Sequence, residues 1–176
     1  YLFSRWWVIF HCIAVLVAMT GVYLALTHSN NIHARLGLIS FGVFSWTEIT
    51  RMLLVVTYLG HLRQSYLTQT DPMLKTIIRA DIENFQYVGE GLFTIFILAF
   101  ALGNFFYGLE LLKKDILGRW TGITLLIWSG INILGLTSVF IPVNGLDLFF
   151  EYFNVTFQPF ARALTAFWLL KQVHQT

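Results

Sequence analysis

The sequence predicts an all-α integral membrane protein, a bundle of about five transmembrane helices with a short amphipathic interfacial helix between the second and third. The first reason is composition: 57% of the 176 residues are hydrophobic and 11% are charged, whereas a soluble domain carries about 25% charged residues. The second reason is that the apolar runs are continuous rather than alternating, which excludes a membrane β-barrel pattern. Each run also exceeds the roughly 20 residues that a helix needs to cross the hydrocarbon.

The apolar runs are separated by short polar or turn-forming segments, and we expect them to form one transmembrane domain over residues 1–176. The expected spans are residues 6–27, 35–60, 85–112, 120–141 and 148–170. Four spans with a re-entrant segment is the alternative. Lys and Arg residues are divided almost evenly between the two expected membrane faces, so the positive-inside rule does not assign an orientation.

The connection between the second and third spans contains a helix start, because Asp71 is a good N-cap and Pro72 suits the first helical position. Apolar residues then recur at helical spacing, at positions 73, 74, 77, 78 and 82. This pattern predicts an amphipathic helix over residues 72–84 that lies at the membrane surface. Alternatively, the same residues lengthen the third span into solvent.

The second span carries Glu48 and Arg51 near its middle. A charge at the centre of a membrane helix costs roughly 2.5 kcal/mol or more, so such residues normally face protein or water and have a partner. Residues three apart lie on one helix face. We therefore expect Glu48 and Arg51 to pair and to lie at the centre of the bundle.

Polar residues of the other spans fall at similar depths when about 1.5 Å is counted per helical residue. The expected ligand-binding site or polar core comprises Glu48, Arg51, Glu90, Glu151, Arg162, Asn132 and His11. These carboxylates exceed the arginines by one, so either one carboxyl is protonated or His11 is charged. The layer is either a site for a small solute, a proton or a ligand, or a set of groups that hold the helices together.

The histidines raise the question of a haem group. His11 lies within the first span, whereas His61 lies at the membrane edge about ten residues away in depth, or roughly 15 Å. Two axial ligands of one iron cannot be that far apart, so a bis-histidine haem is not expected. The sequence also lacks the His and Cys spacings of common metal sites. It assigns no catalytic residue, and any cofactor stays unknown.

Glycines in the third and fourth spans indicate close helix approach, and Gly118 and Gly122 have the small-x-x-x-small spacing. Residues 111–122 read Leu-Leu-Lys-Lys-Asp-Ile-Leu-Gly-Arg-Trp-Thr-Gly, a basic loop between two apolar spans. With its flanks, over about residues 100–135, this segment resembles uncharacterised bacterial multi-pass membrane protein families. Those families usually have Pro where this chain has Gly118, and the resemblance implies no activity.

We therefore expect a non-catalytic membrane protein that handles a small ligand or ion, or that serves as an accessory subunit of a larger membrane complex. The alternative is a membrane enzyme that acts on a lipid-like substrate, with Glu48 and Glu90 as acid and base. The expected surrounding is a lipid bilayer, the bacterial inner membrane, with other subunits or further copies of the chain left open as partners. The formal net charge of +2 gives no support for a nucleic-acid partner.

Overall fold

The computed structural model describes residues 2–26, 31–140 and 146–174, and within these ranges every regular element is a helix. The side chains of residues 2, 138–151 and 154 lie outside that description. The elements are α1 (Leu2–Leu26), α2 (Ile32–Leu54), η1 (Val55–Leu59), α3 (Gly60–Thr68), α4 (Pro72–Leu111), α5 (Ile116–Phe140) and α6 (Leu146–Val173). Because α2, the π-helical turn η1 and α3 are continuous, the described residues form five long helices. The predicted all-α class is thereby confirmed.

Four of these helical stretches are long and apolar enough to cross a membrane. They are Phe3–Leu26, Ile32–Thr68, Pro72–Leu111 and Ile116–Thr137. The chain is therefore a multi-pass helical membrane protein. Within the residues that the structure describes, these are the helices of that length and hydropathy, and α6 is not one of them.

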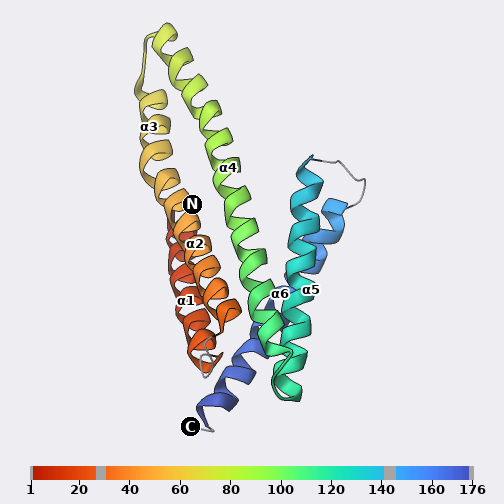
Figure 1. Ribbon diagram of the computed structural model, residues 1–176. Helices are drawn as coiled ribbons and strands as arrows, with labels where there is room; N and C mark the ends of the chain where they lie inside the picture. Colours follow the sequence, from red (N-terminus) through yellow and green to blue (C-terminus); the bar gives the residue numbers. More distant parts are fainter. Residues whose placement is uncertain (1, 27–30, 141–145, 175–176) are drawn as a thin grey trace.

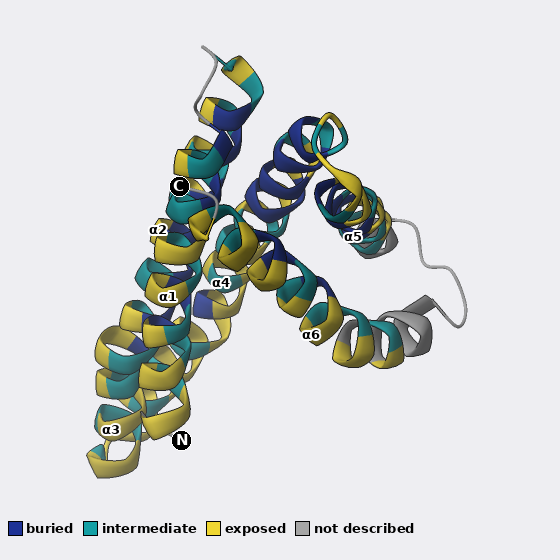
Figure 2. Ribbon diagram, turned by 90° about the horizontal axis from the view of Figure 1, so that it is seen from below, coloured by how far each residue is buried: buried dark blue, intermediate teal, exposed yellow. Residues whose placement is uncertain are grey.

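Helix α4 lies at the centre of the arrangement (Figure 1). It packs against α2 on one side and α5 on the other, while α1 covers α2 and α6 covers α5. Helix α6 then reaches across the bundle to α1, which closes the ring of contacts. Buried residues follow the surfaces where these helices meet, and exposed residues follow their outer surfaces (Figure 2). The segments that surround α4 are therefore brought together from all parts of the chain.

The start of α4 matches the prediction, but its length does not. Asp71 caps the helix by accepting a hydrogen bond from the backbone N–H of Met73 at 2.8 Å, and Pro72 is the first helical residue. From there α4 runs without a break for 40 residues, or about 60 Å. The prediction of a separate interfacial helix over residues 72–84 is therefore wrong, because these residues form the first part of one continuous helix, as in the alternative of a lengthened third span.

The physical reason is that α3 lies alongside the first half of α4. The ammonium of Lys75 lies 4.8 Å from the centre of the Tyr66 ring on α3, and the rings of Tyr58, on the preceding turn η1, and Phe85 lie 5.8 Å apart. A bilayer core takes about 20 residues of a helix. Helix α3 and the first half of α4 therefore form a hairpin that projects beyond the length of a single span (Figure 1).

Glycines lie where helices approach most closely. A Cβ atom at Gly122 would lie 2.8 Å from the carbonyl oxygen of Gly108, at the crossing of α4 and α5. Gly103 is similarly close to the ring of Phe41. Lipid tails provide no hydrophobic driving force between membrane helices, so association depends on such close packing. The expectation that glycines of the third and fourth spans mark helix contacts is confirmed at these positions.

Hydrogen bonds between helices strengthen this packing. The Tyr107 hydroxyl on α4 donates to the backbone oxygen of Met19 on α1 at 2.9 Å. Ser129 on α5 donates to the backbone oxygen of Ala101 on α4 at 2.8 Å. These bonds satisfy polar groups that would otherwise be unpaired in an apolar interior.

We expect Gly37→Ala to destabilise the protein, because the new Cβ would lie 2.4 Å from two ring carbons of Tyr107. The Tyr107 ring is fully buried and held by its bond to Met19, and overpacking of this kind costs about 1–3 kcal/mol. Thermal unfolding in detergent measures the effect. Gly42→Ala is the matched control on the same helix, since nothing lies within 4 Å of its Cβ position. Equal melting temperatures for the two variants would contradict the packing described here.

Candidate functional site

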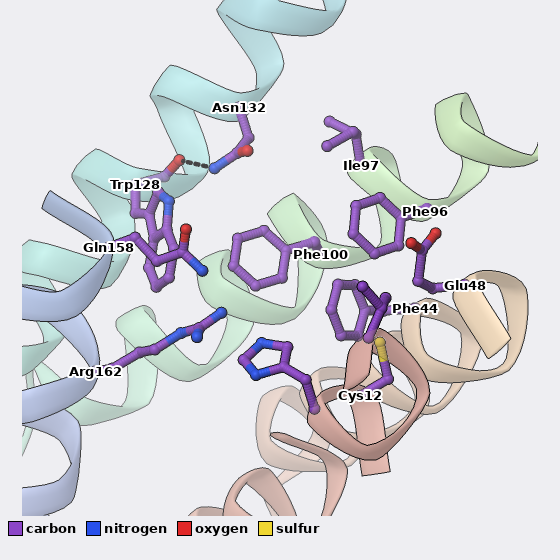
Figure 3. Close-up of a pocket in the computed structure, with 12 residues that line it drawn as sticks. Cys12, Phe44, Glu48, Phe96, Ile97, Phe100, Trp128, Asn132, Gln158 and Arg162 are labelled. Atoms are coloured by element: carbon purple, nitrogen blue, oxygen red, sulfur yellow. Dashed lines mark hydrogen bonds between the residues drawn. The ribbon is translucent and has the colours of Figure 1, made fainter. Parts of the chain in front are cut away.

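A pocket of about 260 Å³ lies between α1, α2, α4, α5 and α6 (Figure 3). Its polar lining comes from four helices that are distant in sequence. His11 lies on α1, Glu48 on α2, Asn132 on α5, and Gln158 and Arg162 on α6. The pocket is therefore built by the tertiary fold and not by any one segment.

An aromatic bridge forms one wall of this pocket. The ring of Phe44 on α2 lies 5.1 Å from that of Phe100 on α4, which lies 4.8 Å from Trp128 on α5. Trp128 in turn lies 6.4 Å from Phe157 on α6. Aromatic pairs at these distances contribute about 0.5–1.5 kcal/mol each beyond their burial. The bridge fixes the four helices relative to one another at the depth of the pocket.

The short connection between α1 and α2 makes them antiparallel neighbours. The Ser45 hydroxyl on α2 donates to the backbone oxygen of Cys12 on α1 at 3.2 Å. This contact brings His11 and Glu48 to the same pocket, because each lies within one turn of the bonded residues. Cys12 also lines the pocket and is buried.

Glu48 and Arg51 form the ion pair that their spacing predicts. The Nε of Arg51 donates to one carboxylate oxygen of Glu48 at 2.7 Å, and an Nη donates to the other at 2.6 Å. The Glu48 side chain is 5% exposed and that of Arg51 is 23% exposed. The Arg51 guanidinium also lies 5.6 Å from the centre of the Phe93 ring. Arg51 does not line the pocket itself, but it neutralises the carboxylate that does.

Arg162 and Gln158 lie on the side of the pocket opposite Glu48 (Figure 3). With its amide oxygen turned toward the guanidinium, Gln158 accepts hydrogen bonds from both Nη atoms of Arg162. Asn132 uses its amide N–H to bond the backbone oxygen of Trp128 at 2.7 Å. Among the described side chains, the ion pairs include no carboxylate partner for Arg162.

Glu90, another expected member of the polar layer, does not line this pocket. Glu90 is exposed and accepts a hydrogen bond from Gln86 at 2.8 Å on its own helix. Helices α4 and α5 diverge from their crossing toward the start of α4 (Figure 1). The Glu151 side chain lies outside the described residues.

The charged groups described at the pocket are Glu48 and Arg162, with Arg51 bonded to Glu48. Among these described side chains, Glu48 and Arg51 pair with each other and Arg162 has no carboxylate partner. The expected excess of one carboxylate counts Glu151 and stays a prediction.

A second chamber of about 300 Å³ adjoins the first and was not predicted. The two share His11, Phe100, Trp128 and Arg162, and the rest of the second chamber comes from α1 and α6. Apart from the shared polar groups and Thr165, its lining is apolar. The sequence signal for this chamber is the run of small and apolar residues on one face of the first span. The same run also fits a helix face that packs against another helix without a cavity.

A second buried carboxylate, Glu110, was also missed. Its side chain is 4% exposed and lies 2.8 Å from the ammonium of Lys113 and 2.7 Å from Nδ1 of His33 on α2. The i, i+3 spacing of Glu110 and Lys113 was the available signal. This cluster joins α2 to α4 at the end of the bundle away from the projecting hairpin, and His33, Glu110 and Lys113 do not line the pocket.

The described residues contain no group of three or more His, Cys, Asp or Glu side chains that could hold a metal ion. His11 lines the pocket, whereas His61 is exposed on α3. These two histidines therefore occupy different environments.

We expect Glu48→Leu and Arg51→Leu each to lower the melting temperature strongly, because either change leaves a buried charge without its partner. Breaking a buried pair typically costs about 3–5 kcal/mol, whereas replacing both members with apolar residues is often nearly neutral. The double variant should therefore recover most of the stability lost in either single variant. Thermal unfolding of the three variants in one detergent tests this. Additive losses in the double variant would show that the pair is not coupled.

Comparison of the chain with protein-family models, with curated proteins and with solved structures finds no match. The resemblance of residues 100–135 to uncharacterised bacterial membrane families therefore stays a prediction.

Proposed function

We propose that this chain is a non-catalytic membrane protein with five spans that binds a small ligand in the pocket between its helices. The observation that carries the proposal is the convergence of His11, Glu48, Asn132 and Arg162 from four helices on one cavity. Polar side chains inside a membrane bundle usually face partners or a solute pathway. Here they face a cavity that is large enough to hold a molecule.

Arg162 separates this proposal from a purely structural role. Glu48 and Arg51 satisfy each other, as a pair that stabilises helix packing would. Arg162, in contrast, has the neutral amide of Gln158 beside it and no carboxylate partner among the described ion pairs. An arginine in a cavity at membrane depth is suited to binding a group that arrives from outside the chain.

The fifth span is α6. Its 28 residues extend about 42 Å, enough to cross the hydrocarbon. Lys171 near its end pairs with Asp115, the residue before α5, so α6 ends beside the start of α5. The bond from Lys171 lowers the pKa of Asp115 below its usual value. Because polar side chains of α6 line the pocket, we expect α6 to have a lower mean hydropathy than the other spans.

The alternatives receive less support from the geometry. Acid–base catalysis by Glu48 and Glu90 needs both groups at one substrate, but Glu48 bonds to Arg51 and Glu90 bonds to Gln86. An accessory subunit needs no cavity lined with polar groups. Ligand binding accounts for the pocket, so we favour it over both.

We expect the five-span topology to appear in accessibility labelling. Single cysteines at positions 69, 114, 147 and 172, each in a Cys12→Ser background, should react with a membrane-impermeant maleimide from defined sides. Positions 69 and 147 should label from one side of the membrane, and positions 114 and 172 from the other. Labelling of 147 and 172 from the same side would show that α6 does not cross.

We expect the protein released gently from its native membrane to carry a small bound molecule that native mass spectrometry detects. Ala18→Trp should abolish or reduce this adduct, because Ala18 lines the second chamber and is exposed there, so a large ring fills the space without displacing the core. Val17→Trp is the matched control, since Val17 is exposed next to Ala18 and does not line either chamber. A wild-type protein without an adduct, or an adduct equally retained in both variants, would contradict ligand binding in this cavity.

A further inference from the structure

The two adjoining chambers differ in chemistry. The first is lined by Glu48, Asn132 and Gln158 in addition to the shared groups, while the second is lined mainly by aliphatic side chains of α1 and α6. Arg162 belongs to both linings, so its guanidinium lies at the junction. The cavity is thus polar at one end and apolar at the other, with a cation where the two meet.

The apolar chamber is open at the surface between α1 and α6. Ala14 and Ala18 on α1 and Ala166 on α6 line it and are themselves exposed. Farther along, Leu169 closes the gap, because its side chain lies 3.1 Å from the Cβ position of Gly21. Small side chains therefore leave an opening on a surface that faces hydrocarbon in a spanning bundle.

The charges that face the cavity favour an anion. The Glu48 carboxylate is engaged by both an Nε and an Nη donor of Arg51. The Arg162 guanidinium has Gln158 beside it, and the carboxyl side chains described near the cavity provide no ion pair for it. His11 lines both chambers and carries a ring N–H donor in either neutral tautomer. A planar guanidinium matches the geometry of a carboxylate or phosphate.

We infer that the ligand is a single-chain amphipathic anion, with its carboxylate or phosphate group on Arg162 and its apolar chain in the chamber between α1 and α6. This inference rests on the proposed function and names the ligand class of the same pocket. The ligand enters sideways from the bilayer through the opening at Ala14, Ala18 and Ala166, head group inward. Gln158 holds the guanidinium in place, and Asn132 lies on the polar side of the head group.

The size of the chamber fits this ligand class. An apolar cavity of about 150 Å³ in another protein holds a benzene molecule. The apolar chamber here measures about 300 Å³, and its opening lets a longer chain continue into the bilayer. A compact inorganic anion would fill the polar pocket and leave the apolar chamber empty, which forfeits the contacts that its lining can make.

The test uses the full chain in nanodiscs of zwitterionic phosphatidylcholine, with binding measured by native mass spectrometry across a ligand titration. The probes are dodecanoate, dodecyl phosphate, the neutral dodecanol, and acetate and inorganic phosphate as head groups without a chain. The variants are Arg162→Gln, Arg162→Lys as the conservative change, Ala18→Trp for the chain, and Val17→Trp as its control. Melting temperatures and size-exclusion profiles establish that each variant is folded.

We expect dodecanoate or dodecyl phosphate to bind the wild type with a dissociation constant that rises about tenfold or more in Arg162→Gln, since hydrogen bonds to charged groups are the strong ones. Arg162→Lys should retain part of this affinity, and Ala18→Trp should lose it while Val17→Trp keeps it. Tighter binding of dodecanoate would indicate a carboxylate head group, and tighter binding of dodecyl phosphate would indicate a phosphate head group.

Two results would overturn the inference while leaving the proposed function intact. Dodecanol that binds as tightly as the anions, with no effect of Arg162→Gln, would identify a neutral ligand. Acetate or phosphate that binds as tightly as the long-chain anions, with no effect of Ala18→Trp, would identify a small soluble anion. If no probe binds and the native adduct is equally retained in Ala18→Trp and Val17→Trp, then the proposed ligand site itself is wrong.

Discussion

The ion pair of Glu48 and Arg51 determines how α2 is turned in the bundle. Because a charge in hydrocarbon is costly, the helix face that carries Glu48 must point toward protein. Phe41, Phe44 and Ser45 lie on that face and are buried, whereas Trp46 on the opposite face is 74% exposed. The aromatic contacts from α2 to α4 and the Ser45 bond to α1 follow from this rotation. The position of the pocket therefore depends on one pair of residues three apart in sequence.

The features that the sequence predicts well are local ones. Asp71 and Pro72 form a helix start by their own chemistry, and Glu48 and Arg51 pair because both belong to one helix. Residues 72–84 show the limit: their apolar spacing is the same whether the helix lies on a membrane or continues beside α3. The choice depends on contacts such as those between Tyr58 and Phe85, which join segments 27 positions apart and cannot be seen from periodicity.

Which residues line the site depends on the tertiary structure even more than the helix boundaries do. Depth counting places Glu90 level with the polar layer, but it does not show that this side chain is exposed and bonded to Gln86 on its own helix. It placed Arg162 in the same layer, where the structure puts it on the cavity beside Gln158. With Glu90 away from the pocket, Glu48 is the carboxylate among the described lining side chains, and it pairs with Arg51. Counting charges by depth therefore does not show which of them face the cavity.

Because the apolar chamber is open to the bilayer, the head group of a ligand, and not its chain, determines which ligand the pocket binds. In a membrane, a chamber that opens between α1 and α6 is in contact with acyl chains, and an empty apolar space loses the dispersion contacts that a chain would make. Any chain of suitable length can fill the space lined by Ala14 and Ala18. Selection between ligands must therefore depend on the head group and on Arg162. The Arg162 guanidinium lies at the inner end of the chamber, and within the described residues it has no carboxylate partner.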